Sequence, residues 1–264
     1  MKAERDLTAT ICDTPWKAYQ FKYQLADEIE TAGHMVVKGS DDRPIRSQDS
    51  FFMRNVAARM RESPVVLWLH DLTKLALDGQ KLFVGRKLDR NLIKTEQLWI
   101  FENDLQVHTD TSPFQIVPEW YGLSACLFPP NVEGFPRVVM VIMQPQAHLI
   151  PEHVKDQVQS GDISEVRPLL YILELDGIVQ PGLGQPAVAA LSEFINLEIA
   201  MSQPVSISRQ IRRAAERANR RIPEIRVVTL RRRKAESHSA DSESVDWSCR
   251  WLVGGHWRNQ WFPK

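Results

Sequence analysis

Short apolar runs of strand length recur through the middle of this sequence, and Asp, Asn, Gly or Pro residues bound each of them. The series comprises residues 65–70, 81–86, 97–102, 105–108, 114–117, 121–128, 137–143 and 169–175. Apolar runs of about four to eight residues between turn-forming residues are typical of β-strands. Apolar residues follow helical spacing at residues 14–32 and 49–62 instead. We therefore predict an α+β fold in which N-terminal helices accompany a mixed or antiparallel sheet.

The composition excludes several classes of protein. Hydrophobic residues make up 43% of the chain and charged residues 25%, which is ordinary for a globular domain with a core. The longest apolar stretches, residues 64–69 and 138–143, are far shorter than the roughly 20 residues that cross a bilayer as a helix. The charged N-terminal run lacks the apolar segment of a secretory signal. We expect a soluble, cytoplasmic protein that has no membrane partner.

The cysteines and histidines do not indicate a cofactor or a metal. Cys12, Cys126 and Cys249 are widely spaced and odd in number, so the sequence predicts neither a disulfide framework nor a CxxC motif. The seven histidines are scattered, and no HxH or HxxxH spacing brings two of them together as a metal pair. We therefore expect free thiols, no metal site and no cofactor.

A cluster of Gly and Pro at residues 177–186 predicts a linker between a body, residues 1–180, and a C-terminal module, residues 187–264. In this module we expect a helix at 187–200, a turn at 202–205 and a helix at 207–221 that Ser206 caps. A strand at 225–230, a polar link at 231–244 and an alternating strand at 245–253 follow. The module is thus predicted to be a small helix-helix-β-hairpin unit.

The charge distribution is more informative than the net charge, which is zero. Residues 201–264 contain 14 Lys and Arg against 6 Asp and Glu, whereas residues 1–200 contain 19 against 27. An acidic body joined to a basic segment favours one of two arrangements. Either the basic segment binds an external polyanion, or it docks on the body.

The helix predicted at residues 207–221 carries six of these 14 basic residues. A narrow apolar stripe follows helical spacing, and the other faces carry Arg209, Arg212, Arg213, Arg217, Arg220 and Arg221. Crowded guanidinium groups repel one another unless anions lie near, and phosphates bind Arg well. The helix therefore predicts contact with RNA or DNA, extended by Arg231, Arg232 and Arg233. Two alternatives stay open: a helix-turn-helix in which residues 206–213 enter the major groove, and internal docking.

The C-terminal end is rich in Trp, Arg and His. If residues 256–261 are extended, His256, Arg258 and Gln260 share one face. An imidazole can move a proton and a guanidinium can stabilise charge on phosphate, so His256 and Arg258 are candidate catalytic residues of a metal-independent nuclease. The same residues fit binding without catalysis, or a structural role in which Trp257 and Trp261 anchor a core.

This end also carries a family resemblance. Residues 250–260, RWLVGGHWRNQ, preceded by the strand at 226–230 with Arg231 and Arg232, resemble the C-terminal signature of actinobacterial and actinophage proteins. They are similar, more distantly, to the GHWR-type ending of phage and plasmid proteins that include a type V-A anti-CRISPR inhibitor. The resemblance covers about residues 205–262, and relatives continue beyond the position of Lys264 with a further Trp, Ile, Pro and Gly segment.

The resemblance implies a protein of phage or mobile-element origin that interferes with host nucleic acid or its expression, and it assigns no catalytic residues. Together with the arginines, it predicts an accessory protein that binds RNA or DNA through its basic C-terminal module. A ribonuclease-like toxin or inhibitor that uses His256 and Arg258 is one alternative. A protein-binding inhibitor of a host factor, without nucleic acid contact, is the other.

Overall fold

A computed structural model describes most of the chain as two compact units. The described residues are 12–38, 44–86, 96–105, 120–129, 138–146, 149–155, 167–174, 178–179, 185–196, 200–230, 251–253 and 256–258. The first unit comprises Met1–Arg231 and the second Arg232–Lys264. The boundary predicted at residues 177–186 falls inside the first unit, because the segments that follow it complete the same sheet.

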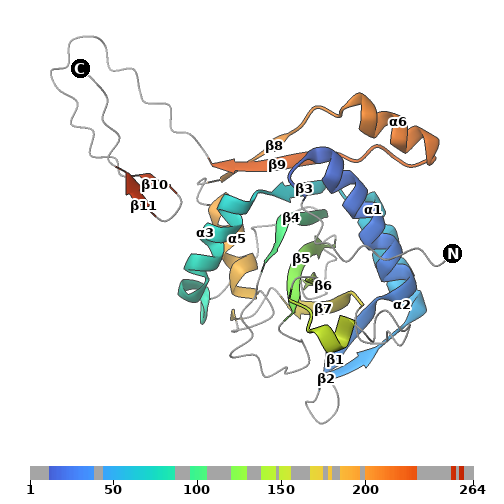
Figure 1. The fold of residues 1–264 in the computed structure, drawn as a ribbon, viewed down its shortest axis with the longest axis horizontal. Helices are drawn as coiled ribbons and strands as arrows, with labels where there is room; N and C mark the ends of the chain where they lie inside the picture. Colours follow the sequence, from blue (N-terminus) through green and yellow to red (C-terminus); the bar gives the residue numbers. More distant parts are fainter. Residues whose placement is uncertain are drawn as a thin grey trace. The chain divides into compact units, whose positions relative to one another are not determined.

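A mixed sheet of nine strands runs through the described part of the first unit (Figure 1). These are β1 (His34–Lys38), β2 (Pro44–Ser47), β3 (Val65–Trp68), β4 (Gln97–Leu105), β5 (Tyr121–Phe128), β6 (Val138–Pro145), β7 (Leu169–Glu174), β8 (Ala200–Pro204) and β9 (Ile225–Leu230). Their order is β2-β1-β7-β6-β5-β4-β3-β9-β8. β3 is parallel to β4 and β9, and β1 to β7, whereas the other pairs are antiparallel. The prediction of an α+β fold with a mixed sheet is confirmed.

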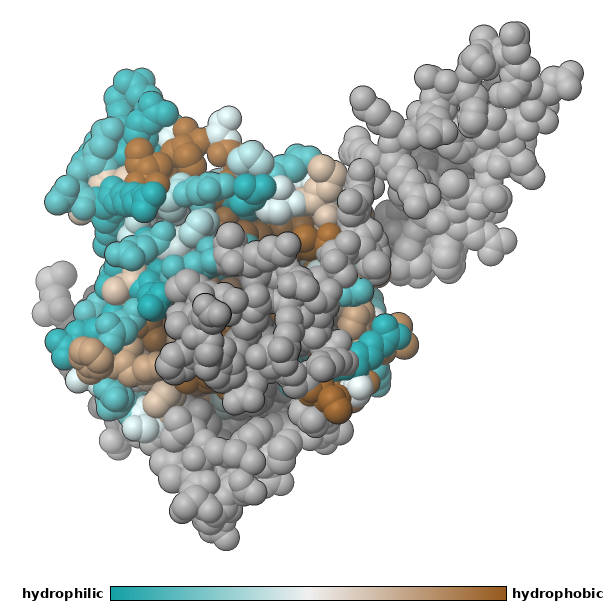
Figure 2. Space-filling view, turned by 180° about the vertical axis from the view of Figure 1, so that it is seen from behind, coloured by the Kyte–Doolittle hydropathy of each residue, from teal (hydrophilic) through white to brown (hydrophobic). Residues whose placement is uncertain are grey.

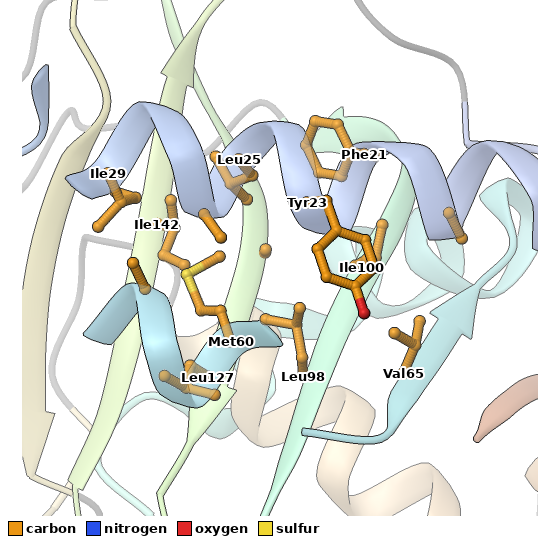
Figure 3. Close-up of a cluster of buried hydrophobic side chains, with 14 of the residues drawn as sticks. Phe21, Tyr23, Leu25, Ile29, Met60, Val65, Leu98, Ile100, Leu127 and Ile142 are labelled. Carbon is orange, nitrogen blue, oxygen red and sulfur yellow. The ribbon is translucent and has the colours of Figure 1, made fainter. Parts of the chain in front are cut away.

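Two N-terminal helices, α1 (Pro15–Ala32) and α2 (Ser50–Glu62), cover one face of the sheet (Figure 3). Thr14 caps α1 by accepting a hydrogen bond from the Lys17 amide, and Asp49 caps α2 in the same way. α1 ends at Gly33, where a Cβ atom would lie 2.7 Å from the Ile29 carbonyl oxygen. Cap residues and helical periodicity agree in both segments, and the helices predicted at 14–32 and 49–62 are confirmed.

The opposite face of the sheet is covered by α3 (His70–Gly79), the 3-10 turn η1 (Gln80–Phe83) and α5 (Gln185–Asn196). Since both faces are covered, β3 and β5 are buried along their whole length. The strand predicted at 65–70 ends at Trp68, and η1 occupies the first half of the strand predicted at 81–86. α3 was missed because no cap residue marks its start: its N-cap, Leu69, forms no side-chain cap hydrogen bond, although Leu72 and Ala76 are buried at helical spacing.

The segment predicted to begin the C-terminal module is the end of this sheet. β8 replaces the turn predicted at 202–205, because it pairs with β9 in an antiparallel register from Ala200 to Pro204. The helix that follows, α6 (Arg209–Arg217), is shorter than the predicted 207–221, and Ser208 rather than Ser206 is its N-cap. It ends before Asn219, which has a φ of 49° in the left-handed region that Asn tolerates.

A helix-turn-helix is excluded by this arrangement. α5 packs into the core cluster on one face of the sheet, whereas the buried side chains of α6 join the cluster on the face that α1 and α2 cover. The strand β8 also separates the two helices in the chain. α6 therefore has no partner helix that would hold it in a DNA major groove in the way that motif requires.

The second unit contains a short antiparallel hairpin, β10 (Trp251–Val253) and β11 (His256–Arg258), among its described residues. Val253 pairs with His256, and Trp251 pairs with Arg258. Only the last three residues of the strand predicted at 245–253 are described. The side chains of both strands and the link at 231–244 lie outside the described residues.

Candidate functional site

Four arginines of α6 are exposed to solvent. Arg209, Arg212, Arg213 and Arg217 are all exposed, and none of them forms an ion pair with another residue in the described part of the chain. Three of these lie in the first half of a helix that has no acidic residue in its first turn. The N-terminus of a helix carries partial positive charge and disfavours cations. The helix dipole therefore works against Arg209, Arg212 and Arg213, whereas it favours Arg217 in the last turn.

Two apolar side chains fix α6 to the body. Ile211 is 1% exposed and Ala215 is fully buried, and both belong to the core cluster beneath α1 and α2. Ile207 and Ala214 pack against the same cluster and are partly buried. The buried stripe predicted for this helix is therefore confirmed at Ile211 and Ala215. Further along the stripe, Ala218 and Ile222 are exposed, because the helix ends at Arg217.

A groove runs between α6 and α1 and consists of two hollows that share Trp16 and Ala214. The smaller hollow, of about 360 Å³, is bounded by arginines and Trp16: its lining comprises Trp16, Arg209, Gln210, Arg213, Ala214 and Arg217. The larger hollow, of about 600 Å³, extends along α1 and is lined by Trp16, Tyr19, Gln20, Tyr23, Gln24, Asp27, Glu28, Thr31, Ala214 and Arg220. Hydrophilic residues cover most of the surface around α6 in Figure 2. The groove is thus basic at one end and carries carboxylates at the other.

Aromatic side chains of α1 line the larger hollow, and one of them, Trp16, also lines the smaller hollow. The rings of Trp16 and Tyr19 are stacked, with centroids 5.7 Å apart and planes inclined by 16°. Tyr19 in turn contacts Tyr23 edge to face at 5.1 Å. Tyr19 and Tyr23 are each 3% exposed, whereas Trp16 is only partly buried. Trp16 is therefore the member of this row that a ligand in the groove can reach.

Arg220 behaves differently from the arginines of α6. Its guanidinium lies over the Tyr23 ring, 4.2 Å from the centroid, and 4.0 Å from a carboxylate oxygen of Asp27. The Tyr23 hydroxyl donates a hydrogen bond to the Arg221 carbonyl at 3.2 Å. Burial raises the pKa of Tyr23 and so does Tyr19, whereas Arg220 and Arg61 act in the opposite direction. Internal docking on the body is therefore observed for Arg220.

The carboxylates at the far end of the groove are already hydrogen-bonded. Asp27 accepts a bond from Arg61 of α2 at 2.7 Å. Glu28 accepts bonds from the amide groups of Gln24 at 3.0 Å and Gln144 at 2.9 Å. These bonds hold two negative charges at the larger hollow. A phosphate would be repelled there, whereas it would be attracted to the arginines at the opposite end.

A buried lysine lies beneath the groove on the inner side of α1. Lys22 is fully buried, and its ammonium group donates a 2.6 Å hydrogen bond to the carbonyl oxygen of Ser63, the C-cap of α2. Burial lowers the pKa of Lys22 to about 7; Arg221 acts in the same direction and Glu62 opposes it. This side chain has no contact with solvent and belongs to the packing of α1 on α2.

The predicted site residues divide into three groups. Arg209, Arg212, Arg213 and Arg217 lie together on α6, and Arg220 lies at the far hollow. Arg231, Arg232 and Arg233 lie outside the described residues, as do the side chains of His256 and Arg258. The sequence did not identify Trp16 and Tyr19 as part of a site, because they fit the apolar stripe of α1. Their aromatic rather than aliphatic side chains are the one sequence feature that could have indicated a binding role.

We found neither a metal-like cluster nor a membrane-spanning helix in the described part of the chain. No group of three or more His, Cys, Asp or Glu side chains there is arranged to hold a metal ion. No helix among these residues is both long and apolar enough to span a bilayer. A comparison with protein families, with curated proteins and with solved structures gave no match to this chain.

Proposed function

We propose that this protein binds nucleic acid, RNA or DNA, along α6 and the groove beside α1. The observation that carries the proposal is the set of four exposed arginines on α6 that have no carboxylate partner among the described residues. Guanidinium groups form paired hydrogen bonds with phosphate oxygens, and a row of them follows a phosphate backbone. Binding of this kind releases counterions and weakens as salt rises.

Internal electrostatics do not account for these arginines. Arg209 and Arg213 are four residues apart, as are Arg213 and Arg217, so like charges face each other along the helix. The dipole of α6 adds to this repulsion at its N-terminal end. Arg61 and Arg220, in contrast, have carboxylate partners. A polyanionic ligand would relieve the repulsion on α6, and nucleic acid is the polyanion whose phosphate spacing and bases also suit a groove with an aromatic wall.

The test is binding of the full chain to fluorescently labelled 20-nucleotide RNA and DNA of mixed sequence, measured by anisotropy over a range of salt concentrations. We expect the logarithm of the association constant to fall linearly with the logarithm of salt concentration. The variant Arg213→Gln/Arg217→Gln removes two charges from the smaller hollow. It should bind at least about tenfold more weakly at low salt and with a shallower salt dependence.

A matched control removes two arginines elsewhere. Arg54 and Arg59 are exposed on α2, outside both hollows of the groove, so Arg54→Gln/Arg59→Gln has the same net charge as the first variant. We expect this control to bind within about twofold of the unmodified protein. Undetectable binding at low salt, or an equal loss in both variants, would refute the proposal.

A further inference from the structure

The geometry points to a single-stranded ligand, with one base stacked on Trp16 and its phosphates on the arginines of α6. This inference rests on the proposed function and adds the form of the nucleic acid. It follows from three features of the groove: an accessible aromatic ring, three exposed arginines of α6 on one side of that ring, and two carboxylates on the other side, where Arg220 already lies beside Asp27.

Trp16 is placed as a platform for a base. It lines both hollows, and its stacking on Tyr19 holds the indole in one orientation from within the body. Arg213 and Arg217 line the hollow that begins at the same indole. Stacking on an aromatic ring beside a basic track is how proteins bind single strands without reading their sequence. The bases of a duplex are stacked on one another and are not free to lie on Trp16.

The carboxylate end of the groove also favours a single strand. Phosphates that continued straight from α6 along the larger hollow would approach the side chains of Asp27 and Glu28, which hydrogen bonds hold in place. A stiff duplex presents its phosphates at regular intervals and cannot turn them away over this distance. A flexible strand can direct its phosphates out of the groove and leave a base in it. Gln20, which lines this hollow, offers an amide group to the edge of such a base.

The inference is tested with three 12-unit probes: a single-stranded oligodeoxynucleotide, its duplex, and an abasic strand with the same number of phosphates. We expect the single strand to bind at least about tenfold tighter than the other two at the same salt concentration. Trp16→Leu keeps an apolar side chain on α1 but removes the ring. It should lower affinity for the single strand by roughly 10- to 100-fold and leave affinity for the abasic strand unchanged.

Control variants separate stacking from a change in fold. Trp16→Phe retains a ring and should keep most of the affinity, and its salt dependence should match that of the unmodified protein because the phosphate contacts remain. Phe51→Leu removes an aromatic residue that is 71% exposed on α2, away from the groove, and should change nothing. If no probe binds at low salt, the proposed function itself fails. If the duplex binds as well as the single strand, or Trp16→Leu weakens all three probes equally, only the single-strand inference fails.

Discussion

The basic side chains on α6 and those packed around α1 form two sets that differ in whether they have partners in the body. Lys22, Arg61 and Arg220 each have a partner in the body: a carbonyl oxygen for Lys22, two carboxylates for Arg61, and a ring with a carboxylate for Arg220. Arg209, Arg212, Arg213 and Arg217 on α6 are exposed, and among the described residues they have no such partner. In the first set, the ion-paired Arg61 and Arg220 contribute to the stability of the fold, whereas the buried charge of Lys22 opposes it near neutral pH. The second set repels itself and is available to a ligand.

This difference shows why net charge is a poor guide to function in this chain. The total charge is zero, and arginines occur on α2 as well as on α6. α6 differs in that Ile211 and Ala215 are its only deeply buried residues. Most of its surface is therefore accessible to a ligand. Stability measurements can test this division without any ligand. A side chain that holds the fold together should cost stability when it is removed, and one reserved for a ligand should not.

The largest effect on the free energy of unfolding is expected from the titration of Lys22 as the pH changes. Its pKa of about 7 in the folded protein lies below the value of 10.5 for an unperturbed lysine. Between these two values the unfolded chain binds more protons than the folded chain, so the free energy of unfolding should rise with pH. We expect this residue to contribute a rise of about 3 kcal/mol from pH 7 to pH 10.

The contribution of Lys22 is isolated by comparing urea denaturation of the unmodified protein and Lys22→Met across this pH range. Other groups titrate in both proteins and cancel in the difference. The methionine variant should lack the rise and should be the more stable of the two at pH 7, because a buried ammonium group is costly. Parallel pH profiles for the two proteins would show that Lys22 is not desolvated in the folded state.

Arg61 should show the next largest effect. Its guanidinium donates hydrogen bonds to Asp27 at 2.7 Å and to Glu30 at 2.6 Å, and its side chain is 30% exposed. Removing it leaves two carboxylates of α1 close together without their partner. We expect Arg61→Met to lower the free energy of unfolding by about 1 to 2 kcal/mol at neutral pH and low salt. If the free energy of unfolding falls by less than about 0.5 kcal/mol, Arg61 stabilises the fold no more than the arginines of α6 do.

A smaller effect is expected for the contact between Arg220 and Tyr23. The guanidinium lies 4.2 Å from the ring centroid, which is favourable for a cation-π interaction. A double-mutant cycle with Arg220→Gln and Tyr23→Leu should give a coupling energy of about 0.5 to 1 kcal/mol. The cycle removes the general cost of each substitution from the result. A coupling energy near zero would mean that Arg220 is as free as the arginines of α6.

The part of the fold that the sequence predicts well is the part that local signals determine. α2 begins at a predicted cap residue, Asp49, and the bounds of β5 and β9 are the predicted ones, because apolar periodicity and turn residues agree there. β8 was predicted as a turn, since Ser202 and Pro204 favour one. Its strand conformation comes from pairing with β9, from Ala200 with Leu230 to Pro204 with Arg226, and no local pattern contains such a contact.

The candidate site was predicted only in part for the same reason. The arginines are visible in the sequence because charge density is a local property. The groove is not, since it requires α1 to lie beside α6, and Trp16 and Arg213 are almost two hundred residues apart in the chain. Trp16 on its own looks like a core residue at helical spacing. Trp16 comes to line both the basic and the acidic hollow only because α1 packs beside α6.

The smallest effect on the free energy of unfolding is expected at Arg209. The sign of this effect is the most informative of the series. This residue opens α6, where the helix dipole disfavours a cation, and it lies four residues before Arg213. Arg209→Gln should therefore raise the free energy of unfolding by about 0.3 to 0.5 kcal/mol at low salt, and the gain should vanish at about 1 M salt as screening removes both repulsions. Most substitutions destabilise a protein, so a gain here would mean that the fold carries Arg209 at a cost. A loss of more than about 0.5 kcal/mol would instead make Arg209 a stabilising element and would remove the contrast between α6 and the body.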